Sequence, residues 1–286
     1  MPQQTVLISA SQLDNIQLCT RLHYFKDILY LSPMEGKSEG LEKGDLFHYL
    51  LDLHYKSLIA SNSTSLIDVG LVEELGLNKA TELSLKDEEA KGIIYLYKEY
   101  RDFYPFEESI WEPEESEVPF AVVVFEDEDL KIILQGKIDL LAKNKKLGLP
   151  LVIDHKYSSK NYPVSSRDTQ NLSYCLATGR RDFIINQAGD QKSYSPDKRF
   201  LRPSFCYSED KIQEFRDDVI YWTLEIIKNH FRSVNGDHIP ANRKACKFFN
   251  KPCTYWDLCE TSKDNLEGKI ESDFMRTDKL RKGLFG

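Results

Sequence analysis

The sequence lacks the features that direct a chain into or across a membrane. Its amino terminus has no basic segment followed by an apolar one, and no hydrophobic run is long enough to cross a bilayer. Positive charge is not in excess either, because the sequence has 38 basic and 46 acidic residues and a formal net charge of −8. These absences predict a cytoplasmic protein with no membrane partner. They exclude a surface that is basic throughout, although a local basic channel can still bind phosphates.

Internal repeats, low-complexity tracts and paired Cys-x-x-Cys motifs are also missing, which argues against repeat arrays and ordinary zinc knuckles. The 286 residues are 41% hydrophobic and 12% aromatic, which supports a sizeable core in about one or two domains. Six cysteines in a large chain without a secretory signal are expected to be reduced, buried or metal-ligating, and not disulfide-bonded.

Residues 135–157 are the most informative stretch. Two apolar runs flank a polar turn at residues 144–149 and predict two adjacent strands. Each run contains one aspartate, Asp139 or Asp154, where a carboxylate is costly to bury without a cation or a donor. Asp154 and Lys156 are two residues apart, so a strand places both side chains on one face. Two carboxylates beside an ammonium group suit the binding of a divalent metal and a water against a phosphodiester.

The motif Gly136-Lys-Ile-Asp139 followed by Asp154-His-Lys156 resembles the catalytic signature of the PD-(D/E)XK nuclease superfamily, and of its RecB-like branch in particular. Alone, such a pattern also describes a surface ion pair. Further matches follow in the family's order: Ser9-x-Ser11 with Cys19, Gly44 with His48, Glu117, Gln170 with Tyr174, and cysteines at residues 246–259. The resemblance implies an α/β nuclease core, with a mixed central sheet flanked by helices, and a helical iron–sulfur clasp.

The resemblance also implies roles for single residues. Asp139 and Asp154 would bind Mg²⁺ or Mn²⁺ together with the main-chain carbonyl of His155, and His48 would complete the metal site. Lys156 would orient the attacking water. The other implied site residues are the accessory acid Glu117, the strand-positioning Gln170 and Tyr174, and the phosphate contacts Lys160 and Arg167. A packed or surface histidine at position 48 and a solvated carboxylate at position 117 are the alternatives.

Cys246, Cys253 and Cys259 are framed by aromatic residues and indicate ligands of one metal centre, with Cys19 as the candidate fourth thiolate. This distribution resembles the 4Fe–4S cluster of RecB-like iron–sulfur nucleases. Zinc is the competing metal, because four thiolates also make a tetrahedral site. Unligated buried thiols are the third interpretation. A cluster would close a long loop and act as a structural clasp.

The clasp would join segments 9–31 and 240–262 into a single nuclease domain over residues 1–286. Residues 267–286 are highly charged and are expected to form a mobile tail or a terminal helix. Helical spacing begins at residues 9 and 44 and covers 71–104, 168–178 and 209–231. Strands are expected at residues 117–125, 131–142, 151–157, 182–186 and 200–207, with a loop at 105–119.

The implied function is metal-dependent hydrolysis of DNA phosphodiester bonds. Its most specific form is an exonuclease that degrades single-stranded DNA from a 5′ end, with a possible endonuclease side activity. A helicase, a recombination or repair protein, or a CRISPR-adaptation protein is the implied partner. Two other classes stay open. A non-catalytic DNA-binding or helicase-partner subunit needs neither the carboxylates nor the lysine, and a zinc-binding interaction protein would contain zinc and cleave nothing.

Overall fold

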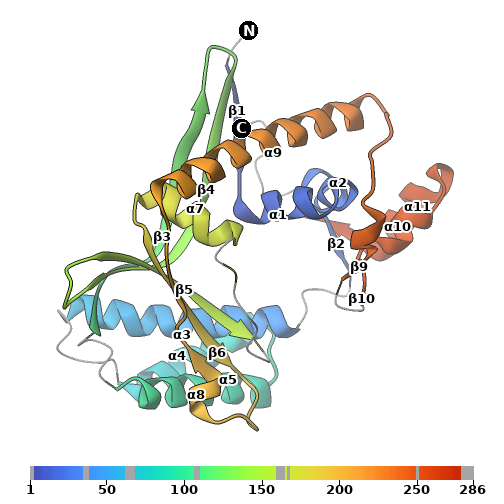
Figure 1. The fold of residues 1–286 in the computed structure, drawn as a ribbon. Helices are drawn as coiled ribbons and strands as arrows, with labels where there is room; N and C mark the ends of the chain where they lie inside the picture. The colour runs from blue at the N-terminus through green and yellow to red at the C-terminus, as the bar shows by residue number, and fades with distance from the viewer. Residues whose placement is uncertain are drawn as a thin grey trace. The chain divides into compact units, whose positions relative to one another are not determined.

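The computed structural model describes residues 3–34, 39–61, 68–105, 110–158, 165, 168–248 and 251–277 (Figure 1). The chain divides into two compact units, each assembled from separate stretches of sequence. We call residues 37–120 and 137–212 the carboxylate unit, and residues 1–36, 121–136 and 213–286 the cysteine unit. Strands β3 (Trp111–Glu126) and β4 (Leu130–Asn144) contribute residues to both units. That the two units form a single nuclease domain remains a prediction.

The carboxylate unit contains a mixed sheet with helices packed against it. Its further elements are α3 (Glu39–Ala60), α4 (Val69–Glu82), α5 (Asp87–Phe103), β5 (Pro150–Ser158), α7 (Thr169–Thr178), β6 (Asp182–Gly189), α8 (Pro196–Arg199), β7 (Phe200–Leu201) and β8 (Ser204–Cys206). β5 pairs antiparallel with β4 and parallel with β6, and β7 and β8 pair antiparallel with β6. α3 packs on β5, and α7 packs on β5 and β6. The predicted α/β core with a mixed sheet is confirmed.

Local chemistry places the two helices that supply site residues. α7 begins because the Asp168 carboxylate accepts hydrogen bonds from the main-chain N–H groups of Gln170 and Asn171. It ends at Gly179, whose φ of +69° favours glycine. α3 buries one apolar face, including Phe47 and Tyr55, in the main core between α4, α5 and β5.

The cysteine unit has its own smaller core. Its elements are β1 (Gln4–Ile8), α1 (Ala10–Leu18), α2 (Thr20–His23), the π-helical turn η1 (Tyr24–Ile28), β2 (Leu31–Pro33), α9 (Glu209–Val234) from residue 213 onward, the 3₁₀ turn η2 (Arg243–Cys246), β9 (Lys247–Phe248), β10 (Lys251–Pro252), α10 (Trp256–Glu260), α11 (Lys263–Asp273) and β11 (Phe274–Arg276). Phe25, Leu31, Tyr255, Leu258 and Phe274 pack together. Even the longest described helices, α3 and α9, do not have the apolar character of a membrane span.

Several strands were not predicted where they occur, and β1 and the first part of β3 are the longest of these. β1 precedes the helix that Ser9 caps, and it pairs in parallel with residues 130–134 of β4. β3 already begins at Trp111, inside the predicted loop 105–119. Pro113 is tolerated there because β3 pairs with β4 alone among the described strands, and an edge strand has a free side for a residue without an N–H.

The C-terminal stretch forms a helix followed by a short strand. Residues 267–276 continue α11 and form β11, which pairs antiparallel with β2. Ile270 and Phe274 are buried against Tyr255, and this burial holds the segment in place. Of the two expectations for residues 267–286, a terminal helix describes the part up to Asp273 and a mobile tail does not, and residues 278–286 lie outside the described residues.

Candidate active site

Asp139 and Asp154 lie on neighbouring strands of the carboxylate unit. β4 and β5 pair antiparallel, with Leu140 opposite Ile153. Asp139 precedes Leu140 on β4 and Asp154 follows Ile153 on β5, so each aspartate is the next residue along its strand from this pair. Both side chains are buried, and Asp154 is completely inaccessible. The structure thus places both carboxylates within adjacent strands, and their burial has to be compensated locally.

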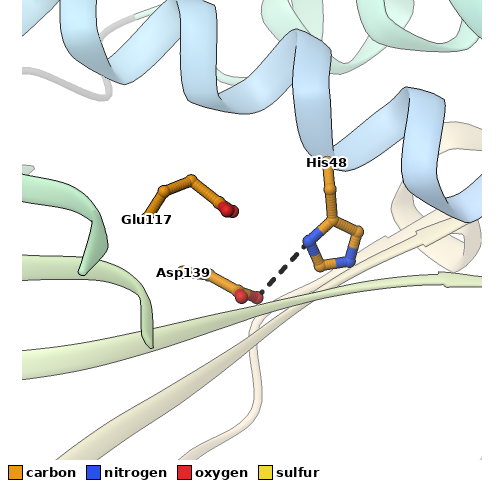
Figure 2. Close-up of side chains that lie close together, drawn as sticks. All are labelled: His48, Glu117 and Asp139. Atoms are coloured by element: carbon orange, nitrogen blue, oxygen red, sulfur yellow. Dashed lines mark ion pairs between the residues drawn. The ribbon is translucent and has the colours of Figure 1, made fainter. Parts of the chain in front are cut away.

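Three potential ligands meet beside β4 (Figure 2). His48 comes from α3, Glu117 from β3 and Asp139 from β4, and one nitrogen or oxygen of each lies within 4.8 Å of the other two. Nδ1 of His48 is 3.6 Å from Oδ2 of Asp139. Ligands that bind Mg²⁺ at about 2.1 Å lie about 3 to 4 Å from each other. The separation of His48 and Asp139 lies in this range, and Glu117 is close enough to be a third ligand of the same cation.

Glu117 reaches this group from an unusual main-chain conformation. Its φ of +57° lies in the left-handed region, which residues other than glycine rarely adopt. Figure 2 shows its side chain directed toward Asp139 and His48. Strain of this kind is concentrated at functional sites. A glutamate held there against its conformational preference supports a role in the site.

Lys137 is a site neighbour that the sequence prediction missed. It forms an ion pair with the Glu117 carboxylate, and this hydrogen bond raises the pKa of the lysine. Lys137 and Asp139 are two residues apart on β4, so they share one face of the strand. That spacing was the available signal, and it is the same signal that pairs Asp154 with Lys156.

The electrostatic balance of the site calls for an additional cation. Burial raises the pKa of Asp139 to about 7, against an opposing hydrogen bond that the main-chain N–H of His155 donates at 2.8 Å. Burial also raises the pKa of Asp154 to about 7, although Lys156 opposes this shift. Desolvation lowers the pKa of His48, which keeps the imidazole neutral and able to ligate. A divalent cation fits this donor set, because it would stabilise both carboxylates in their ionised form.

Alternate side chains of β5 face opposite sides of the sheet, and this separates Lys156 from His155. Nζ of Lys156 lies 2.9 Å from Oδ2 of Asp154 and donates to Oε1 of Gln170 at 2.6 Å. Nε2 of Gln170 in turn donates to Oη of Tyr174 at 2.6 Å. Burial lowers the pKa of Lys156, but attraction to Asp154 reverses the shift, and the net pKa is raised. Lys156 is therefore a cation in a fixed position.

Of the remaining predicted site residues, the structure describes Tyr174 and His155 but not Lys160 and Arg167. Burial raises the pKa of Tyr174, so its phenol stays neutral and can donate a hydrogen bond. His155 is buried on the α3 side of β5, and a role of its main-chain carbonyl as a ligand remains a prediction. Lys160 and Arg167 lie outside the described residues.

The four cysteines predicted as ligands come together in the cysteine unit. Cys19 lies between α1 and α2, Cys246 ends η2, and Cys253 and Cys259 lie before and within α10. All four line one small pocket. The main-chain N–H of Asn242 donates to Sγ of Cys19 at 3.3 Å. Segments far apart in sequence thus bring the four predicted cysteines to one pocket.

Burial raises the pKa of the Cys253 and Cys259 thiols, and the neighbouring thiols add to the shift. That the four cysteines bind a metal, as an iron–sulfur cluster or as a zinc site, remains a prediction.

Comparison with known proteins identifies the architecture. The family model described as "PD-(D/E)XK nuclease superfamily" matches residues 7–260. No curated protein matches the chain. A crystal structure named "Putative exonuclease", from Eubacterium rectale, aligns with a TM-score of 0.44 and 14% identity over 88% of this chain and 92% of that one. An alkaline exonuclease from Laribacter hongkongensis aligns with a TM-score of 0.33 and 11% identity over 66% and 91%.

Proposed function

Because the chain belongs to the PD-(D/E)XK nuclease superfamily, we propose that it is a divalent-metal-dependent exonuclease that hydrolyses phosphodiester bonds of DNA. One observation carries the proposal. His48, Glu117 and Asp139 converge within 4.8 Å, next to the ion pair of Lys156 with Asp154. A metal-ligand group beside a fixed cation is the arrangement that phosphodiester hydrolysis needs.

The metal would be held by the side chains of His48, Glu117, Asp139 and Asp154, with the main-chain carbonyl of His155 as a further ligand. When bound, it supplies Lewis-acid polarisation of the phosphoryl group. An imidazole among carboxylate ligands favours Mn²⁺ over Mg²⁺, because nitrogen donors bind transition metals more strongly.

The protein's own groups orient the reactants. Lys156 cannot turn freely, because Asp154 and Gln170 hold its ammonium group from two sides. It therefore places a positive charge where negative charge develops on the phosphate, and it can orient a water molecule by donating a hydrogen bond. Gln170 and Tyr174 lie along one face of α7 and position the DNA strand. Lys160 and Arg167 are proposed phosphate contacts.

The finer details of the substrate rest on the family resemblance. We propose single-stranded DNA as the preferred substrate, with degradation starting from a 5′ end. A helicase or a recombination partner is a prediction of the same kind. An assay with strands labelled separately at each end reports both preferences.

For the cysteine unit we propose a structural 4Fe–4S cluster bound by Cys19, Cys246, Cys253 and Cys259. One observation supports it: the four cysteines come from distant parts of the sequence and line one pocket. Anaerobic purification should yield a brown protein with about four irons and broad absorption near ~400 nm. A colourless protein that carries one zinc would replace this proposal with the zinc alternative.

The function is tested with end-labelled single-stranded DNA and Mn²⁺, comparing the native protein with Asp154→Ala and with Asp102→Ala as a matched control. Asp102 is an exposed aspartate of α5 in the same unit. We expect cleavage by the native and control proteins and none by Asp154→Ala. Absence of cleavage by native protein on both single- and double-stranded DNA would favour the non-catalytic subunit. Equal cleavage by all three proteins would place the active site elsewhere.

A further inference from the structure

His155 lies at the centre of a buried hydrogen-bond network behind the metal-ligand group. Its partner on the neighbouring parallel strand β6 is Asn186, and the two residues lie side by side in the register. Both are buried. Nδ2 of Asn186 lies 2.9 Å from Nδ1 of His155 and also donates to Oη of Tyr100 at 2.9 Å.

Arg202 determines which way the Asn186 amide points. Nε of Arg202 donates to Oδ1 of Asn186 at 3.1 Å, and its Nη2 donates to Oη of Tyr100 at 2.6 Å. A guanidinium group can only donate hydrogen bonds. The atom that faces it must therefore be the amide oxygen, so the amide NH₂ faces His155. Arg202 is itself held in place, since its Cζ lies 3.3 Å from the centroid of the Tyr104 ring.

This orientation determines the tautomer of His155. Because the Asn186 NH₂ group donates toward Nδ1, that nitrogen must accept, and the ring proton resides on Nε2. Among the described residues, Nε2 of His155 has no hydrogen-bond partner. The ring cannot rotate freely, because the Tyr55 ring stacks on it at 5.3 Å with an interplanar angle of 6°.

His155 connects this network to the metal ligands in two ways. Its main-chain N–H donates to Oδ2 of Asp139 at 2.8 Å, which is the same oxygen that lies 3.6 Å from His48. Its ring meets the His48 ring edge to face, with centroids 6.1 Å apart. A displacement of His155 therefore moves one carboxylate and one imidazole of the metal-ligand group together.

From this geometry we infer that Asn186 and Arg202 are positioning residues of the nuclease site, acting through His155 to hold Asp139 and His48 ready for the metal. The inference rests on the proposed function, because it assigns a purpose to the same site. Groups that orient metal ligands in this way typically contribute a factor of about 10 to 100 in metal affinity or activity.

Asn186→Asp is the test variant, because it keeps the side-chain shape and replaces the donating NH₂ with an accepting oxygen. The matched control is Asn229→Asp: Asn229 is a buried asparagine of α9 in the cysteine unit, and it also accepts a hydrogen bond from an arginine, Arg232, at 3.0 Å. The two variants make the same chemical change, but only Asn186 contacts the ring of His155.

Two readouts separate positioning from a merely structural role. The first is ¹⁵N NMR of histidine-labelled, metal-free protein, with the His155 signals assigned through His155→Gln. We expect an unprotonated Nδ1 in the native protein and in Asn229→Asp, and a protonated Nδ1 in Asn186→Asp. The second is Mn²⁺ binding by calorimetry, where we expect Asn186→Asp to weaken binding by about 10- to 100-fold and the control to leave it unchanged. Arg202→Lys, which retains a donor, should weaken binding less than Arg202→Ala.

A protonated Nδ1 in the native protein, or native Mn²⁺ affinity in Asn186→Asp, would overturn the inference. Neither readout requires cleavage of DNA. A native protein that binds Mn²⁺ through this network but cleaves nothing would refute the nuclease proposal and leave the positioning role intact. If the native protein cleaves DNA and all variants bind Mn²⁺ with equal affinity, the nuclease proposal stands and the positioning role is refuted.

Discussion

Asp139→Asn is expected to stabilise the metal-free protein at pH 8. Burial raises the pKa of Asp139 to about 7 from its ordinary value of 3.8, so ionisation in the folded state is unfavourable. This upward shift of the pKa corresponds to a free-energy cost of at most about 4 kcal/mol for ionising Asp139 in the folded protein. An asparagine has nearly the same shape, keeps an oxygen that accepts from the main-chain N–H of His155, and carries no charge.

The sign of the pH dependence follows from proton binding. The folded pKa lies above the unfolded value, so between about pH 4 and pH 7 the folded native protein binds more protons than the unfolded chain. Native stability therefore rises as the pH falls through this window. The advantage of Asp139→Asn should be largest above pH 7 and should nearly vanish at about pH 4.

Mn²⁺ should offset this advantage of the variant. A ligand that binds only the folded state adds about 4.1 kcal/mol at 1,000 times its Kd, and the variant lacks one of the three converging ligands. Thermal and urea unfolding would be measured in a chelator and in Mn²⁺ at pH 8 and at low pH, with Asp102→Asn as the exposed control. If Asp139→Asn in chelator at pH 8 is no more stable than the native protein, then the burial cost inferred for this carboxylate is wrong.

Three further predictions concern the site, the cysteines and the core. Mn²⁺-dependent cleavage should decline as the pH falls below about 7, because both buried aspartates have a pKa raised to about 7 and must be ionised to bind the cation; a flat pH–rate profile between about pH 5 and 8 would contradict this. Cys19→Ser and Cys253→Ser should each lower the iron content and the ~400 nm absorption, whereas Cys175→Ser, which lies outside the cysteine pocket, should leave both at native values. Gly92→Ala in α5 should stabilise the protein by about 0.5–1 kcal/mol in urea unfolding, because its Cβ meets nothing within 4 Å. Gly76→Ala in α4 should raise the stability less than Gly92→Ala or lower it, because its Cβ would lie 3.0 Å from a leucine methyl group of α3. An equal gain in stability at both positions would refute this account of the packing.

The ligand-bearing strands could be predicted because their signals are local. The alternation around Asp139 and Asp154 is enough to define two adjacent strands, and the four-residue spacing of Gln170 and Tyr174 is enough to place both on one helix face. The helical spacing over residues 71–104 likewise indicates which side chains of α5 pack inward, and Tyr97 and Tyr100 are fully buried in the main core.

Features that depend on distant partners could not be predicted. β1 is a strand because residues 130–134 pair with it, and no short window of sequence contains that information. The positive φ of Glu117 and its ion pair with Lys137 arise where β3 and β4 meet, and the sequence pattern shows only the spacing on each strand. The contact between Arg202 and Asn186 requires the chain to turn back on β6, so neither residue stood out in the sequence.

The discontinuous composition of the two units has a consequence for biosynthesis. Cys19 leaves the ribosome early, whereas its proposed partner thiols follow residue 245. At about 5–20 residues per second, the first thiol waits roughly ten to fifty seconds for the others. During that interval every segment of the carboxylate unit emerges, since that unit ends at residue 212. The part of the chain that carries the proposed nuclease residues can therefore fold first, and loading of the proposed iron–sulfur cluster would be a late maturation step.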